Sequence, residues 1–597
     1  MEIRELKLSN FRCFGPRETV ISFGDLTTFV GLNSSGKTAV LHALLKLFAK
    51  SASARELKRA DFHIEKEEDP TSVIERELYI EAVIVFPELK DESGGSSNTV
   101  PPFFEEMVIS GFGGELYVRV RLEAKWKRGN TPEGDVDQRY FFVTVPPSSN
   151  MEHLDEHKRP VTANHRANIE IIYVPAIRDP ISQLRNASGT ILWRVWNGIN
   201  WPNTINKPMR NVGVQVEHIL GLVEGFSTLQ RIMGEQWRNL HTDARYNNVA
   251  LRFNSVDLDA ILQKLEVRFW PTVESRSYEV DELGEGLRSL FYLSLVNSLM
   301  KLEALALDQQ KKAGSSGNND TEDHRIFTHS FTPPALTILA IEEPENHLAP
   351  HLLGRVMDTL HDIADKSNAQ VVVTSHTPAI VKRIDPKCIR HLRMCKEELC
   401  TIANSICLPS AADEAYKYVK EAVWAYPEIY FARLVVLGEG DTEEIVLPKA
   451  LELLNTTLDR SGISVVPLGG RYVNHFWRLL VELDIPYVTL LDLDLGRATG
   501  GWARIKYVVK QLIEKGVNPE SLLQALNKAL DEHDVSISLC ADDIETLHSR
   551  EDDRKAIESL LGVFANYGIF FASPLDMDFM MLEAFTHAYQ ASAAKGY

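Results

Sequence analysis

The first part of the chain alternates apolar and polar residues. In MEIRELKLSNFRCF, residues 1–14, this alternation predicts a half-buried β-strand, and similar patterns continue to about residue 175. Turn-rich, charged stretches at 91–102 and 125–138 interrupt the pattern, and we expect hairpin loops there. The pattern therefore favours a strand-rich region at the start of the chain.

Residues from about 180 to 250 place apolar side chains at helical spacing, which predicts an inserted helical subdomain. A helix is also predicted from about 285 to 310, whereas 311–334 has the composition of a linker. From about 335 to 395, and again from about 433 to the end, short apolar runs alternate with helical patterns. This alternation indicates an α/β fold class.

The amino-acid composition restricts the classes of protein to which the chain can belong. The 597 residues are 44% hydrophobic and 25% charged, as in a soluble globular protein of about two to four domains. Six scattered cysteines form no disulfide framework, and Cys395 and Cys400 are more typical of half-buried cysteines than of a zinc site. With no signal peptide and no apolar run of membrane-spanning length, we expect a cytoplasmic protein without membrane contact.

A phosphate-binding motif follows an apolar strand at residues 26–30. The pattern G-x4-G-K-T runs from Gly31 to Thr38 and precedes an amphipathic helix. Backbone N–H groups of such a loop cradle phosphates, Lys37 reaches the β- and γ-phosphates, and Thr38 ligates Mg²⁺. The expected ATP-binding residues of this loop are Gly31, Asn33, Ser34, Ser35, Gly36, Lys37 and Thr38.

Two later segments supply the matching half of a nucleotide site. In ALTILAIEEPENHLAP, an apolar strand ends at Glu342, which we expect in the Mg²⁺ shell, and Glu343 is the expected base for the attacking water. One strand later, His376 follows the apolar run AQVVVTS and is a candidate γ-phosphate sensor. A solvated strand edge and a structural histidine are the simpler alternatives.

This order of motifs resembles the ABC-type ATPase heads of RecF and SMC proteins. The matching signature segment is DELGEGLRSLFYL, residues 281–293, with Gly284 and Gly286 at a helix start as expected ATP-binding positions. It departs from the family pattern because no serine or glutamine stands at the usual places. The resemblance implies that two heads close around nucleotide. It therefore implies a homodimer or a higher homo-oligomer, assembled through the heads and the helical insert.

Carboxylates stand at strand ends in the last part of the chain. In ARLVVLGEGDTEEIVLP, Glu439 ends a strand and Glu443 lies on the first turn of the next helix. In IPYVTLLDLDLGR, strand alternation would place Asp492 and Asp494 on one face. Such oxygen ligands suit two Mg²⁺ or Mn²⁺ ions that cleave phosphodiesters, so Glu439, Asp492 and Asp494 are candidate catalytic residues. The alternative is a set of acidic loops that only confer solubility.

These elements resemble the Toprim domain, with its Glu-Gly-x-x-Glu and Asp-x-Asp motifs and a middle strand at 463–471. The later segment FFASPLDMDFMMLEAF is similar to the domain's late acidic element, with Asp578 where glutamate is usual. The resemblance implies these metal ligands: Glu439, Glu443, Asp492, Asp494, Asp576 and Asp578. Lys595 is the only lysine left for the family's late lysine, and we do not assign it that role.

An ABC-type head followed by a Toprim domain is the layout of the OLD (overcoming lysogenization defect) family of endonucleases. The implied fold is a P-loop ATPase with an inserted helical dimerization subdomain and a C-terminal Rossmann-like Toprim domain. The implied boundaries are 1–178 and 250–400 for the ATPase, 179–249 for the insert, 401–432 for a linker and 433–597 for Toprim. The implied cofactors are ATP with one Mg²⁺ or Mn²⁺, and two such ions in the Toprim site.

The family resemblance implies a metal-dependent DNA endonuclease that serves in anti-phage defence. Its partner would be a helicase-like protein or a retron reverse transcriptase with its RNA–DNA hybrid. The alternative is a non-nucleolytic DNA-binding protein of the RecF and SMC kind with a degenerate Toprim domain. The net charge of −19 disfavours nucleic acid in general, although carboxylates that hold cations contribute to it. Candidate DNA contacts are 124–129, 157–160, Arg504, Lys506 and Lys510, each of which also fits a solvated face.

Overall fold

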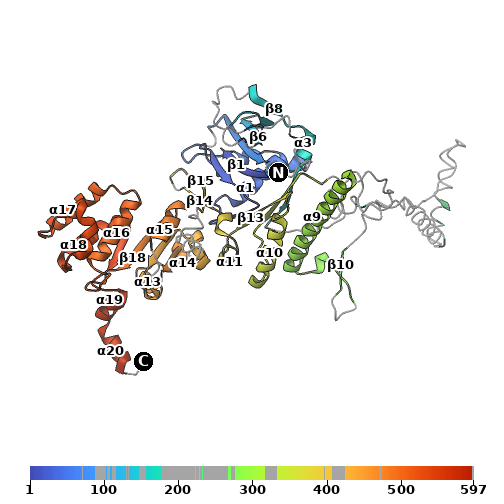
Figure 1. Ribbon diagram of the computed structural model, residues 1–597. Helices are drawn as coiled ribbons and strands as arrows, with labels where there is room; N and C mark the ends of the chain where they lie inside the picture. Colours follow the sequence, from blue (N-terminus) through green and yellow to red (C-terminus); the bar gives the residue numbers. More distant parts are fainter. Residues whose placement is uncertain are drawn as a thin grey trace. The chain divides into compact units, whose positions relative to one another are not determined.

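A computed structural model gives the fold (Figure 1). It describes residues 1–69, 72–87, 103, 108–109, 114, 116–129, 131, 133–146, 156–176, 199, 222, 228, 231–232, 267–270, 276–315, 333–395, 397–406, 424–468 and 473–594. The chain forms two compact units. The first comprises Met1, 87–104 and 162–371, and the second comprises 2–86, 105–161 and 372–597. Lys595 and nearly all of the predicted insert, 179–249, lie outside the described residues.

The second unit begins with an antiparallel sheet in the order β2-β1-β4-β6-β7-β8, and β5 also pairs with β6. The predicted strand-rich region is therefore observed. The predicted loop at 125–138 is shorter than expected, because only 128–134 separate β6 from β7. The strands are β1 (Glu2–Ser9), β2 (Thr19–Ser22), β4 (Glu75–Val85), β5 (Val108–Ile109), β6 (Leu116–Lys127), β7 (Asp135–Val143) and β8 (Lys158–Pro160).

A buried ion pair fastens β4 to β6 within this sheet. Glu81 is fully buried and accepts hydrogen bonds from Arg119 at 2.9 and 3.0 Å and from Arg121 at 3.2 Å. We expect Glu81→Ala to lower the free energy of unfolding by about 3–5 kcal/mol, because it leaves the buried guanidinium group of Arg119 without the carboxylate that it pairs with. Chemical denaturation measures this loss. A loss below about 1 kcal/mol, as for an exposed pair, would contradict this account of the sheet.

Strand β3 (Leu26–Val30) of the second unit is buried along its whole length and leads into helix α1 (Lys37–Phe48). It belongs to a sheet in the order β15-β14-β3-β13. The other strands are β13 (Ala369–Ser375), which crosses the division between the units, β14 (Ile389–Met394) and β15 (Thr401–Ser405). Because β15 pairs with β14, the segment predicted as a linker, 401–432, includes a strand of this sheet. The short helices nearby are α2 (Ala52–Arg55) and α11 (Pro378–Val381).

The first unit is built on the parallel pair β9 (Ile169–Val174) and β12 (Leu336–Glu342), and every residue of β12 is buried. The helix predicted at 285–310 is present as α9 (Glu285–Ser315). The unit also contains α3 (Ala163–Ala167), α10 (Leu353–Ala364) and the hairpin of β10 (Arg268–Phe269) with β11 (Tyr278–Glu279). Within the described ranges, no helix combines the length and the hydrophobicity that crossing a bilayer requires.

The last part of the second unit is a parallel sheet in the order β17-β16-β18-β19, coloured orange to red in Figure 1. Parallel strands end at the same edge, so residues that follow them meet there. The strands are β16 (Leu434–Gly438), β17 (Ile463–Pro467), β18 (Tyr487–Asp492) and β19 (Ile569–Ala572). The helices are α13 (Asp441–Leu453), α14 (Leu458–Ser461), α15 (Val473–Glu482), α16 (Trp502–Glu514), α17 (Pro519–Glu532), α18 (Arg554–Ala565), α19 (Met577–Ala584) and α20 (Thr586–Ala594).

Candidate functional site

Two glycines shape the loop between β3 and α1. Gly31 has a φ of +148°, and a Cβ atom there would lie 2.2 Å from the carbonyl oxygen of Leu392. Gly36 has a φ of +98°, and a Cβ atom there would lie 2.8 Å from Sγ of Cys13. Side chains other than hydrogen rarely tolerate either conformation. Only glycine therefore allows the loop to wrap this closely around the start of the helix.

The same loop offers polar groups that suit a phosphate. Nζ of Lys37 donates hydrogen bonds to the carbonyl oxygens of Gly31 and Leu32, both at 2.8 Å. The hydroxyl oxygen of Ser35 is buried and has no hydrogen-bond partner. An ammonium group inside the loop and an unsatisfied hydroxyl fit a nucleotide phosphate, which accepts hydrogen bonds from both.

The other predicted nucleotide residues of this unit lie at the surface. Asn33, Ser34 and Thr38 are exposed, and Ser34 takes the left-handed conformation with a φ of 63°. His376 directly follows β13 and is also exposed. These side chains are therefore accessible to a ligand in solution.

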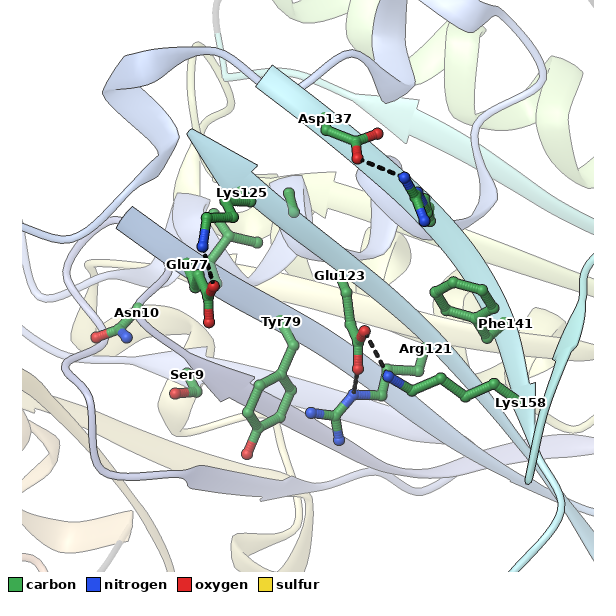
Figure 2. Close-up of a pocket in the computed structure, with 13 residues that line it drawn as sticks. Ser9, Asn10, Glu77, Tyr79, Arg121, Glu123, Lys125, Asp137, Phe141 and Lys158 are labelled. Carbon is green, nitrogen blue, oxygen red and sulfur yellow. Dashed lines mark hydrogen bonds and ion pairs between the residues drawn. The ribbon is translucent and has the colours of Figure 1, made fainter. Parts of the chain in front are cut away.

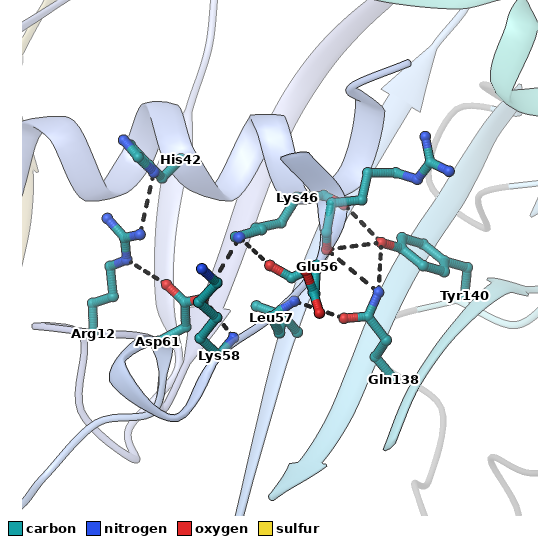
Figure 3. Close-up of polar contacts among 10 residues, drawn as sticks. Arg12, His42, Lys46, Glu56, Leu57, Lys58, Asp61, Gln138 and Tyr140 are labelled. Atoms are coloured by element: carbon teal, nitrogen blue, oxygen red, sulfur yellow. Dashed lines mark hydrogen bonds and ion pairs between the residues drawn. The ribbon is translucent and has the colours of Figure 1, made fainter. Parts of the chain in front are cut away.

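Figure 3 shows polar contacts that fix α1 to its surroundings. Asp61 accepts a hydrogen bond from Nε of Arg12 at 2.8 Å and lies 3.6 Å from Nζ of Lys46 on the helix. Arg12 also lies 3.2 Å from Nδ1 of His42, and the Tyr140 hydroxyl donates to the Lys46 carbonyl at 2.9 Å. Burial raises the pKa of Asp61, but hydrogen bonds from a backbone N–H and Arg12 outweigh it, so the pKa is lowered.

In the first unit, the paired glutamates end β12. Glu342 is buried; its Oε2 accepts a hydrogen bond from the N–H of Ala176 at 3.2 Å, whereas its Oε1 has no partner. Glu343 has a φ of 44° and accepts a hydrogen bond from Asn346 at 2.9 Å. The unsatisfied oxygen of Glu342 is the feature that fits a cation.

The start of α9 packs on the turn that follows these glutamates. A Cβ atom on Gly286 would lie 2.5 Å from the carbonyl oxygen of His347, and Glu285 lies 2.8 Å from Nδ1 of His347. Gly284 precedes the first helical residue, as predicted, and has open space around it. The first unit therefore brings Gly286, one of the two predicted signature glycines, close to the acidic turn.

Five carboxylates of the second unit gather where β16 and β18 end and where α13 and α19 begin. We call Glu439, Glu443, Asp492, Asp494 and Asp576 the carboxylate cluster. Oε2 of Glu439 accepts a hydrogen bond from the N–H of Asp492 at 2.5 Å. Burial raises the pKa of Asp492 to about 7, and the negative charges of the other four members act in the same direction. The sheet therefore concentrates negative charge at one edge.

Asp492 is the least satisfied member of the cluster. Its Oδ1 atom is buried and has no hydrogen-bond partner. Burial also raises the pKa of Glu439, against the opposing charge of Arg504. Half-buried carboxylates of this kind are stabilised by a nearby cation, so the donor set is of the type that divalent ions bind.

Two arginines lie among these carboxylates. Arg504 on α16 lies 2.9 Å from Oε1 of Glu439 and 3.5 Å from Oδ2 of Asp494. Arg497 donates hydrogen bonds to Asp494 and, at 3.2 Å, to Asp576. The sequence suggested Arg504 only as a DNA contact and gave no signal for Arg497 beyond its position three residues after Asp494.

Two other predicted ligands have partners of their own. Glu443 is buried, and its Oε2 accepts a hydrogen bond from the N–H of Gly440 at 2.8 Å. Asp578 is exposed, and its Oδ1 accepts a hydrogen bond from the Thr442 hydroxyl at 3.0 Å. Across the described residues, no three His, Cys, Asp or Glu side chains are arranged to hold a metal ion as they stand. The carboxylate cluster therefore does not form a complete coordination shell in this conformation.

The expectation that Asp494 lies on the same strand face as Asp492 is wrong. Strand β18 ends at Asp492, and Asp494 has a φ of 50°. The chain turns there because the N–H of Asp494 donates to the carbonyl oxygen of Leu575 at 2.9 Å. Asp494 therefore reaches the cluster from a turn and not by strand alternation.

The basic stretches considered for DNA are largely paired with acids. Figure 2 shows a pocket of about 820 Å³ on the N-terminal sheet, where Lys125 donates to Glu77 at 2.8 Å and Lys158 donates to Glu123 at 2.8 Å. On α16, Lys506 and Lys510 pair with Glu545, and Arg504 points into the carboxylate cluster. The charges of Lys125, Lys158, Arg504, Lys506 and Lys510 are thus compensated within the chain.

Protein-family models match both the nucleotide-binding part and the carboxylate-bearing part of the chain. The AAA ATPase domain matches residues 1–113 and 222–381, and the TOPRIM domain of overcoming lysogenization defect-like proteins matches 430–494. The chain joins an AAA ATPase domain to an OLD-like TOPRIM domain. The predicted fold class, an α/β P-loop ATPase followed by a C-terminal Toprim domain, is confirmed, whereas the predicted helical insert lies almost entirely outside the described residues.

Two relatives are similar to most of this chain at low identity. The OLD nuclease of Thermus scotoductus is 22% identical over 510 residues, which cover 83% of this chain and 82% of that protein. The endonuclease GajA of Bacillus cereus strain HuB5-5 is 21% identical over 563 residues, covering 83% of this chain and 77% of that protein. The predicted resemblance to OLD-family endonucleases is confirmed, and the chain has the domains of an endonuclease with an ATPase domain.

Proposed function

We propose that this protein is a divalent-metal-dependent DNA endonuclease whose cleavage centre is the carboxylate cluster of the TOPRIM domain. The observation that carries the proposal is Asp492, a half-buried carboxylate whose buried Oδ1 atom is unsatisfied, among four other carboxylates. The relatives named OLD nuclease and endonuclease GajA support the reaction class. DNA is the proposed substrate.

The cluster supplies the ligands for Mg²⁺ or Mn²⁺. Such ions, when bound, activate water and stabilise the charge that develops on a phosphodiester. Glu439, Asp492 and Asp494 would hold them at the centre, and Glu443, Asp576 and Asp578 from the helix starts. Glu439 and Glu443 each accept a hydrogen bond from a backbone N–H group, and Glu439 also pairs with Arg504, so their orientation is fixed before any ion arrives.

The ATPase domain would regulate this centre. Lys37 and the P-loop would hold the phosphates of ATP, while Thr38 and Glu342 would hold its Mg²⁺ or Mn²⁺ ion. Glu343 is the proposed base, His376 the proposed γ-phosphate sensor, and Gly284 and Gly286 would meet the nucleotide of a facing subunit. A homodimer or higher homo-oligomer is therefore part of the proposal.

Metal binding should depend on pH through Asp492. Because its pKa is raised to about 7, the residue is largely protonated below that pH and binds cations poorly there. We expect the affinity for Mn²⁺ to fall by up to about tenfold for each pH unit below 7 and to level off above pH 8. Calorimetric titration from pH 5.5 to 8.5 measures this, and an affinity independent of pH would contradict the assignment.

Cleavage of supercoiled plasmid tests the function directly. The wild-type chain should nick or linearise the plasmid with Mg²⁺ or Mn²⁺ and leave it intact with EDTA. Adding ATP should change the rate, because the nucleotide site regulates the centre, whereas identical rates would contradict that regulation. Intact plasmid under all metal conditions would favour the alternative, a non-nucleolytic DNA-binding protein of the RecF and SMC kind.

Anti-phage defence is the proposed biological role, on the strength of the resemblance to the OLD family. In that setting the partner would be a helicase-like protein, or a retron reverse transcriptase with its RNA–DNA hybrid. Expression in a phage-sensitive host tests this role. Unchanged plaque formation in the presence of each candidate partner would contradict it.

A further inference from the structure

Arg497 joins two parts of the carboxylate cluster that are far apart in sequence. One of its terminal nitrogens donates to Oδ1 of Asp494 and the other donates to Oδ2 of Asp576 at 3.2 Å. A planar guanidinium fork fixes the spacing of the oxygens that it binds. Arg497 therefore does for these two carboxylates what a bridging divalent ion would do, since it neutralises them and holds them together.

The two arginines at the cluster differ in exposure and in the elements that hold them. The side chain of Arg504 is 19% exposed, and it extends from the first turn of α16, beside the buried Trp502. The side chain of Arg497 is 56% exposed and extends from the turn after Gly496, which has a φ of +83°. Arg504 is thus held in place, whereas Arg497 can move into solvent without disturbing buried contacts.

Electrostatic repulsion determines how Arg497 responds when a divalent cation binds to the cluster. A cation bound to Asp494 or Asp576 would repel a guanidinium group on the same oxygens. Arg497 would lose its partners and remain at the rim of the site with a planar, doubly donating group. That geometry matches a phosphate of the DNA backbone.

We propose that Arg497 is an exchangeable counter-cation, which leaves Asp494 and Asp576 when divalent ions bind and then holds a phosphate of the DNA substrate. The inference rests on the proposed function. It makes Arg497 a positioning residue that couples metal binding to DNA binding. In this role Arg497 competes with the divalent ion for Asp494 and Asp576, but it strengthens DNA binding after the ion has displaced it.

Two binding measurements on the full chain test the exchange. Calorimetry with Mn²⁺ should show that Arg497→Gln binds the ion about fivefold more tightly than wild type, because a partly exposed competing pair of about 1 kcal/mol is gone. Fluorescence anisotropy with a labelled duplex should show that Ca²⁺ strengthens DNA binding of the wild type about fivefold more than that of Arg497→Gln.

Arg554→Gln is the matched control, because Arg554 is 61% exposed and pairs with Glu558, one helical turn away and outside the carboxylate cluster. It should behave as wild type in both titrations. An Mn²⁺ affinity of Arg497→Gln equal to or weaker than that of wild type would overturn the exchange, and so would an undiminished effect of Ca²⁺ on its DNA binding. If the wild type itself binds no Mn²⁺, the proposed metal centre fails together with the exchange.

Discussion

Asp492→Asn is expected to lower the rate of plasmid cleavage by about 10³-fold, the size of loss that follows removal of a central electrostatic group. The substitution keeps the shape of the side chain but removes the charge of the carboxylate at the centre of the cluster. The rate of nicking with Mn²⁺ under single-turnover conditions measures the effect. A loss smaller than about tenfold would contradict the central position of Asp492.

Thermal unfolding separates this loss of activity from a loss of fold. The pKa of Asp492 is raised from an ordinary value of 3.8 to about 7, so ionisation of the native carboxylate opposes folding. Between these two pKa values the native state binds more protons than the unfolded state, and wild-type stability therefore falls as pH rises. In EDTA at pH 8, Asp492→Asn should melt at a higher temperature than wild type. A lower melting temperature would indicate that asparagine has disturbed the site.

Lys37→Ala is the second substitution with a large expected effect. Lys37 is buried in the P-loop and its ammonium group contacts two loop carbonyl oxygens, where a phosphate would meet it. We expect ATP affinity to fall by about 10²-fold, since a charge-assisted contact to phosphate is lost in a buried position. Equilibrium titration with a fluorescent ATP analogue measures this. Lys50→Ala, at an exposed position two residues beyond α1, should bind the analogue as wild type does.

Cleavage by Lys37→Ala then reports on regulation. If nucleotide regulates the TOPRIM centre, this variant should cleave plasmid at one rate with and without ATP. An effect of ATP equal to that on wild type would place the regulatory nucleotide elsewhere. The variant therefore tests regulation without altering any member of the carboxylate cluster.

Local patterns predicted the elements that depend on neighbouring residues. The strand at 26–30, the glycine loop and α1 follow from one continuous stretch in which hydrophobicity, loop glycines and helix spacing agree. The approach of Glu439 and Glu443 is likewise local, because Glu439 directly follows β16 and Glu443 stands on the first turn of α13. Such features can be predicted from sequence alone.

Features that depend on distant segments were not predicted. Asp494 leaves the strand because its N–H donates to the carbonyl oxygen of Leu575, in the segment after β19, which alternation within 487–495 does not reveal. The ion pair of Arg497 with Asp576 spans 79 residues. In the sequence, Arg497 was therefore indistinguishable from an ordinary surface arginine, although it contacts Asp576 in the folded chain.

The most direct test of the proposed nuclease centre compares substitutions of two glutamates, one just before α13 and one on its first turn. Glu439 lies in the carboxylate cluster, whereas Glu444 is exposed on the first turn of the helix and outside the cluster. With Mn²⁺ and supercoiled plasmid, Glu439→Gln should lose nearly all cleavage, and Glu444→Gln should cleave at the wild-type rate. Equal cleavage by the two variants would contradict the assignment of the TOPRIM carboxylates as the nuclease centre.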